Sequence, residues 1–162
     1  MISINKLSKE LKKLADKKIV LLGGCFDILH IGHLRFIEKA KKFGDILVIG
    51  INDDRFIKKT KGNHRPIIPE KQRAELLLGL KAVDYVFVTN KALYDDENLK
   101  KIKPNFLVFA NETDKIKRRK DIAKNIENKF KGIKTIFLSS GVNKVRTSLI
   151  EDKIIKSKIN IS

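Results

Sequence analysis

Short apolar runs alternate along this chain with longer segments of helical periodicity. Each run is rich in β-branched or aromatic residues and apolar at successive positions, which is typical of parallel strands covered on both faces. The predicted strands are Ile19–Leu22, Ile46–Ile51, Tyr85–Val88, Phe106–Phe109 and Thr135–Leu138. The predicted helices are Ile2–Asp16, Leu34–Phe43, Asp54–Lys59, Glu70–Leu80, Leu93–Ile102, Asp114–Lys131 and Thr147–Lys156.

This alternation predicts an α/β fold, a Rossmann-like doubly wound five-stranded parallel sheet with helices on both faces. We expect one domain, residues 1–162, with residues 1–17 as an N-terminal helical extension. Ligands of such sheets bind beyond the carboxyl ends of the strands. Gly23-Gly24, Asn52-Asp53 and Ala110-Asn111 follow three of the predicted strands, so we expect these pairs to converge.

Composition narrows the class of protein further. Hydrophobic residues make up 42% of the chain, enough for a globular core. Cys25 is the only cysteine, which excludes an intramolecular disulfide, and neither a signal peptide nor an apolar run of membrane-spanning length is visible. We therefore expect a cytoplasmic protein that does not contact a membrane.

The formal charge of +17 would suit a polyanionic partner. However, the excess consists almost entirely of lysines spread over every segment, and aromatic residues make up only 7% of the chain. We see no interleaved aromatic and basic pattern for stacking bases. We interpret the charge as a solvated surface and do not expect nucleic acid to be the main partner.

The segment from Gly23 to His33 carries the strongest chemical signal. An apolar run ends in two glycines, and His30 and His33 follow where a helical pattern begins. Unpaired N–H groups at a helix start attract phosphate, and the histidines can donate to its oxygens, while Gly32 lets a ligand approach the backbone. A zinc site with Cys25 as third ligand is the alternative, but no fourth ligand lies nearby in the sequence. We predict a site that handles a nucleoside triphosphate.

A second motif runs from Gly141 to Ile150 and opens the last helix. Thr147 and Ser148 are good N-cap residues, and Lys144 and Arg146 add positive charge beside this second helix start. Two helix N-termini that face one cleft would hold the β- and γ-phosphates between them.

A third, basic segment begins at Lys58 and continues to Arg73, with a turn-rich loop over Thr60–Pro69. We expect Lys58 or Lys61 to close over the phosphates from this loop. Arg73 lies at the start of the next helix, and we expect it either to reach the cleft or to face solvent.

Three polar residues near the strand ends complete the candidate set. Asn52 and Asp27 are candidate contacts of the attacking substrate, with orientation of the loop as the alternative role of Asp27. Asp54 is the candidate N-cap of the helix that follows. We expect Cys25 to be a small packed residue rather than a nucleophile.

With these residues in view, the chain resembles the nucleotidyltransferase (cytidylyltransferase-like) superfamily from about Lys18 to Ile154. The segment Gly24–His33 looks like its highly specific motif G-x-F-D-x-x-H-x-G-H. The segment from Lys58 to Arg73 is similar to its middle motif, and Lys144–Ile150 resembles a degraded form of its C-terminal helix-start motif. The nucleotide-binding residues that the resemblance implies are Gly24, Cys25, Phe26, Asp27, Gly32, Asn111, Thr147 and Ser148.

Within the superfamily the resemblance is closest to bacterial sugar-phosphate adenylyltransferases, notably the heptose 1-phosphate adenylyltransferase domain. Glycerol-3-phosphate cytidylyltransferases and archaeal-type FAD synthases are the alternatives. After the fourth predicted strand, these relatives carry a Gly-rich turn that contains an Asp. This chain has Phe109–Asp114 there instead, so the choice between ATP and CTP stays open. The histidine motif also resembles a signature of class I aminoacyl-tRNA synthetases, but 162 residues leave no room for a tRNA-binding body.

The resemblance implies that a phosphate monoester attacks the α-phosphorus of ATP or CTP and that pyrophosphate leaves. It also implies Mg²⁺ bridging the phosphates with few protein ligands, and it leaves a homodimer open. The implied catalytic residues are His30, His33, Lys58, Lys61 and Arg146. The second hypothesis, from another class, is a catalytically inactive relative that binds nucleotide or RNA.

Overall fold

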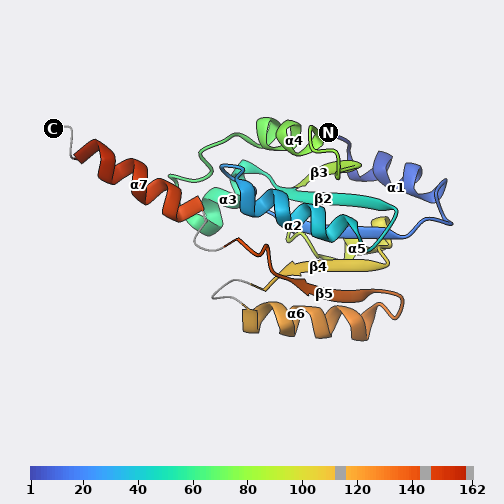
Figure 1. Ribbon diagram of the computed structural model, residues 1–162. Coiled ribbons are helices and arrows are strands. Elements are labelled where there is room, and N and C mark those ends of the chain that lie inside the picture. Colours follow the sequence, from blue (N-terminus) through green and yellow to red (C-terminus); the bar gives the residue numbers. More distant parts are fainter. Residues whose placement is uncertain (112–115, 143–146, 160–162) are drawn as a thin grey trace.

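The computed structural model describes residues 1–111, 116–142 and 147–159 (Figure 1). Its strands are β1 (Ile19–Gly24), β2 (Ile46–Asn52), β3 (Tyr85–Thr89), β4 (Phe106–Ala110) and β5 (Lys134–Leu138). Its helices are α1 (Ile4–Lys12), α2 (Ile31–Lys41), α3 (Asp54–Lys61), α4 (Glu70–Leu78), α5 (Asp96–Ile102), α6 (Ile116–Lys129) and α7 (Thr147–Ile159).

The five strands form one parallel sheet in the order β3-β2-β1-β4-β5, which confirms the predicted architecture. In the register of the central strands, Leu21 of β1 lies opposite Val48 of β2 and Leu107 of β4. The strand order reverses between β1 and β4, because β2 and β3 extend the sheet on one side and β4 and β5 on the other. This reversal marks the crevice where sheets of this kind bind ligands.

Helices cover both faces of the sheet, as the apolar strands predict. On one face α1, α5 and α6 bury residues such as Leu7, Leu99 and Ile126 against the sheet. On the other face α2 and α4 bury Ile37 and Leu77. Successive side chains of a strand point to opposite faces, so each strand contributes to both cores.

The N-terminal segment is part of this architecture. Leu7 and Leu11 of α1 are buried, and the Ser8 hydroxyl donates to the backbone carbonyl of Lys101 in α5 at 2.8 Å. Helix α1 therefore packs against the sheet and α5.

Helix starts differ from the prediction where a polar side chain caps the helix. α2 begins at Ile31 rather than Leu34 because His30 is its N-cap. α3 begins with Asp53, not Asp54, as its cap, since the Asp53 carboxylate accepts from the Phe56 N–H at 2.7 Å. α5 begins at Asp96 rather than Leu93 because Asp95 is its cap.

The last helix, α7, extends away from the body of the molecule (Figure 1). Its residues Leu149, Ile154 and Ile155 are 40%, 50% and 57% exposed. None of the described helices is both long and apolar enough to cross a membrane.

Candidate active site

The sheet opens at the point where the strand order reverses. β1 pairs with β2 as far as Gly24, but its pairing with β4 ends at Leu22. Beyond that residue the N–H of Gly23 donates to the hydroxyl of Tyr94 at 2.9 Å, so a side chain takes the place of the neighbouring strand. The loop from β1 to α2 leaves the sheet here.

This loop has an unusual backbone. Phe26 and Ile28 have φ values of 50° and 52°, in the left-handed region that side chains other than glycine rarely adopt. Such residues cost on the order of 1–3 kcal/mol each and persist only where the surroundings impose them. The ring of Phe26 lies 2.9 Å from where a Cβ of residue 24 would stand, so the loop requires glycine at that position.

Arg73 is one of the groups that impose this conformation. It is 1% exposed, and its guanidinium donates to the carbonyls of Cys25 at 2.6 Å, Asn52 at 3.0 Å and Ile68 at 2.9 Å. It also donates to the carboxylate of Asp54 at 2.7 Å. We expected Arg73 to reach the cleft or to face solvent; instead it lies in the interior, where it joins the β1–α2 loop to the ends of β2 and of the 62–69 loop.

The two histidines lie together at the start of α2. Their rings stack with centroids 3.8 Å apart, and the His33 ring also lies 5.2 Å from that of Phe26. As N-cap, His30 accepts the His33 N–H on its Nδ1 at 3.4 Å. In neutral His30 the proton is therefore on Nε2, which leaves an N–H donor beside the helix N-terminus. Gly32, between the histidines, is buried as the second residue of the helix.

The surroundings favour the neutral form of both histidines. Burial, the adjacent His30 ring and the charge of Lys61 lower the pKa of His33 to about 4. Burial also lowers the pKa of His30. The Nδ1 of His33 is buried and has no hydrogen-bond partner within the described part of the chain. The pair therefore offers N–H donors at the helix start without adding positive charge there.

Of the two predicted catalytic lysines, Lys61 lies close to the histidine pair. Lys61 ends α3 and is near enough for its charge to act on His33. Lys58 lies one turn earlier on α3 and is exposed. The end of α3 thus places positive charge near the histidine pair.

Asp27 has the orienting role that we set beside substrate contact. Its carboxylate accepts from the N–H groups of Ile67 and Ile68 at 3.0 and 2.9 Å and from the Arg65 guanidinium at 2.7 Å. Burial alone would raise the pKa of this carboxyl, but these donors outweigh it and hold the pKa below its usual value. Asp27 therefore fastens the 62–69 loop to the β1–α2 loop.

The start of α7 reaches the same loop. The Thr147 hydroxyl donates to the backbone carbonyl of Asp27 at 2.8 Å, so the start of α7 contacts the loop that leads to α2. Thr147 and Ser148 form the first turn of α7, and Ser148 is exposed. Arg146 lies outside the described residues.

The other two candidates lie at the ends of β4 and β2, the two strands that flank β1. Asn111 is exposed directly after β4, and its N–H donates to the Leu138 carbonyl at 3.0 Å. The side chain of Asn52 donates to the carbonyl of Lys91 at 2.8 Å. The three segments predicted to converge thus end on one edge of the sheet, with Asn52 already engaged within the protein.

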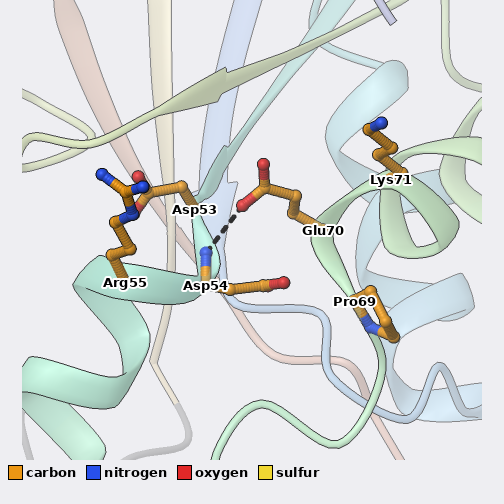
Figure 2. A pocket seen from close by; sticks show the side chains of 6 residues that line it. All are labelled: Asp53, Asp54, Arg55, Pro69, Glu70 and Lys71. Carbon is orange, nitrogen blue, oxygen red and sulfur yellow. Dashed lines mark hydrogen bonds between the residues drawn. The ribbon is translucent and has the colours of Figure 1, made fainter.

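Figure 2 shows a different pocket, between the starts of α3 and α4. Its lining combines three carboxylates, Asp53, Asp54 and Glu70, with the basic side chains of Arg55 and Lys71. Glu70 accepts from the N–H of Asp54 at 2.7 Å, so carboxylates already satisfy the N-terminus of α3. This negative charge disfavours phosphate, whereas the start of α2 carries neutral N–H donors. Of the two places, the start of α2 is the better candidate for a phosphate site.

Sequence reasoning missed the roles of Arg65, Tyr94 and Glu151. Arg65 donates to both Asp27 and Glu151 and is largely buried. The sequence offered one signal for this pairing: a basic residue in a proline-containing loop and an aspartate in the Gly24–His33 motif that needs a partner. Nothing local in the sequence indicates that the hydroxyl of Tyr94 completes the end of β1.

Comparisons with known proteins identify related sequences. Residues 21–153 match the family model described as cytidylyltransferase-like. The bifunctional protein HldE of Nitratiruptor sp. is 47% identical over 105 residues, and that of Helicobacter hepaticus is 50% identical over 110 residues. These matches cover 65% and 67% of this chain but only 22% of each relative, so the chain corresponds to about a fifth of those proteins.

Solved structures show the same architecture. A lipopolysaccharide core biosynthesis protein from Thermoplasma volcanium has a TM-score of 0.63 at 26% identity, covering 76% of this chain and 97% of its own. A pantoate-beta-alanine ligase from Francisella tularensis has a TM-score of 0.64 at 21% identity, covering 96% of this chain and 77% of its own. The second likeness concerns the fold alone.

Proposed function

Because the chain belongs to the cytidylyltransferase-like family, we propose that it transfers a nucleotidyl group from ATP or CTP to a phosphate monoester. The observation that carries the proposal is the stacked, neutral pair His30 and His33 at a helix start beside the opening of the sheet. A site that must bind a triphosphate and later release pyrophosphate gains from donors that attract phosphate without a full charge of their own.

For the acceptor we propose a sugar phosphate such as heptose 1-phosphate, with ATP as the donor. The similarity to two HldE proteins at 47% and 50% identity supports this choice over glycerol 3-phosphate or a flavin. The resemblance of the Gly24–His33 motif to sugar-phosphate adenylyltransferases supports it as well. The Thermoplasma relative, a lipopolysaccharide core biosynthesis protein, is consistent with a sugar acceptor.

In the proposed reaction an oxygen of the acceptor phosphate attacks the α-phosphorus. A new P–O bond forms there as the bond between the α-phosphorus and the bridging oxygen breaks, and pyrophosphate leaves with that electron pair. His30 and His33 donate N–H groups to phosphate oxygens, and Lys61, with Lys58 one turn earlier on α3, neutralises the developing charge. Thr147, Ser148 and Arg146 would hold the leaving pyrophosphate.

We propose that Mg²⁺ enters with the nucleotide. In the described part of the chain, no group of three or more His, Cys, Asp or Glu side chains is arranged to hold a metal. The carboxylate of Asp27, in the β1–α2 loop, already accepts from Arg65 and from two backbone N–H groups. The ion would then serve as a counter-ion of the triphosphate, with the phosphates as its main ligands.

The test is pyrophosphate release with Mg²⁺, offering ATP and CTP separately with heptose 1-phosphate, glycerol 3-phosphate or FMN. We expect turnover with ATP and the sugar phosphate. His33→Ala should lower turnover at least about a hundredfold, the scale of losing one such donor. His64→Ala is the matched control, since His64 is an exposed histidine outside the site and should leave the rate unchanged.

Silence of every pair at high enzyme concentration would refute the proposed reaction. A near-normal rate of the His33→Ala variant would refute the assignment of the histidine pair. If all pairs are silent, salt-dependent binding of RNA without turnover would favour the inactive relative instead.

A further inference from the structure

Helix α7 is joined to the body at its first two turns. The Thr147 hydroxyl donates to the Asp27 carbonyl, and Glu151 accepts from the guanidinium of Arg65. Thr147 and Glu151 are four residues apart, so they lie on the same face of the helix. Further along, Ile154 and Ile155 are 50% and 57% exposed, and Figure 1 shows the helix leaving the body.

Arg65 is the centre of this attachment. Its side chain is 11% exposed and lies between Asp27, which is 4% exposed, and Glu151, which is 20% exposed. One guanidinium nitrogen donates to Asp27 at 2.7 Å and the other donates to Glu151. Planar arginine can satisfy two carboxylates at once in this way, whereas lysine offers a single point charge.

Each carboxylate in the group belongs to a different part of the candidate site. Asp27 lies in the loop that leads to the histidine pair, and it also accepts from the N–H groups of Ile67 and Ile68. Glu151 lies in the helix whose first turn carries Thr147 and Ser148. The charge of Arg65 is thus shared between the two elements that present helix N-termini to the phosphates.

We propose that Arg65 and Glu151 are positioning residues that hold the start of α7 against the β1–α2 loop, so that the N-termini of α2 and α7 bind the same triphosphate. The inference rests on the proposed function for its catalytic consequence. In the proposed reaction neither Arg65 nor Glu151 contacts the reacting atoms. Both act through the placement of Thr147 and Ser148. Loss of the bridge should therefore weaken nucleotide binding more than it slows the chemical step.

The first test does not depend on activity. Hydrogen exchange of the α7 amides is measured in the full chain for wild type, Glu151→Ala and Asp152→Ala. Asp152 is the matched control, an exposed carboxylate on the same helix that has no ion pair with any described residue. We expect exchange to accelerate about tenfold or more in Glu151→Ala, on the scale of one charge-assisted hydrogen bond, and to stay unchanged in Asp152→Ala. Equal exchange in all three proteins would overturn the inference.

The second test measures pyrophosphate release by Arg65→Met, Glu151→Ala and the double variant. We expect each single change to raise the KM for the nucleotide about tenfold with a smaller effect on kcat, and the double variant to match Arg65→Met. Additive effects, or a fall in kcat alone, would contradict positioning through one shared bridge. If the wild type is silent, the proposed function fails while the exchange experiment still decides whether the bridge holds α7.

Discussion

Burial of His33 makes the stability of this protein dependent on pH in a defined direction. Its pKa is about 4 in the fold and 6.5 as the ordinary value, because the ring is buried beside His30 and Lys61. Between these two values the unfolded chain binds a proton that the folded chain does not. The free energy of unfolding must therefore fall as the pH drops from about 7 towards 4. Above 6.5 the ring is neutral in both states, and His33 then costs no stability.

The size of the effect follows from the two pKa values. At about pH 5 His33 is mostly protonated in the unfolded chain and mostly neutral in the fold, which corresponds to a loss of about 2 kcal/mol relative to pH 7. The ring is only partly buried, and water at its exposed edge brings the expected loss to between about 1 and 2 kcal/mol.

Urea denaturation followed by far-ultraviolet circular dichroism measures this, since the chain has no tryptophan for fluorescence. We compare wild type with His33→Gln and with His64→Gln as control, at about pH 7 and about pH 5. The wild type and the control should lose more stability on acidification than His33→Gln, whatever the absolute stability of each protein. An equal loss in all three would refute the reasoning from burial of the ring.

Three further outcomes are expected. Arg73→Met, which leaves three backbone carbonyls without their donor in the interior, should lower the free energy of unfolding by about 3–5 kcal/mol in the same denaturation assay; a loss below about 1 kcal/mol would contradict its central role. Tyr94→Phe leaves the Gly23 N–H without its acceptor and should cost about 1–3 kcal/mol, whereas a neutral result would mean that water replaces the hydroxyl. Lys61→Met removes a positive neighbour and should raise the pKa of His33 above about 4 in an NMR titration, and an unchanged value would separate Lys61 from the histidine site.

The sheet could be predicted from the sequence because its strands are apolar on both faces. β1 and β4 were predicted to within two residues, and the motif at His30 and His33 was placed correctly at a helix start. These features depend on short continuous apolar runs and on the glycine and cap residues that follow them. Such patterns are the part of a fold that a sequence records directly.

What the sequence did not reveal depends on contacts between distant segments. Arg73 belongs to a helical pattern that does not distinguish a solvent-facing arginine from one whose partners are the carbonyls of Cys25 and Asn52. Tyr94 fits the apolar pattern of a helix, yet the helix starts after it because Asp95 caps it. The partners of Arg73, and the Gly23 N–H that the Tyr94 hydroxyl accepts, lie far away in the chain, and no local period encodes them.

The sequence positions of the contacts at α7 also determine when the site is completed. Thr147 and Asp27 are 120 residues apart, and Glu151 and Arg65 are 86 residues apart, whereas all five strands end by Leu138. Contacts of such long range form late, since a long loop must close before they contribute. During synthesis the sheet and both cores can therefore form first, and the start of α7 reaches the β1–α2 loop only after residues 147–151 have left the ribosome.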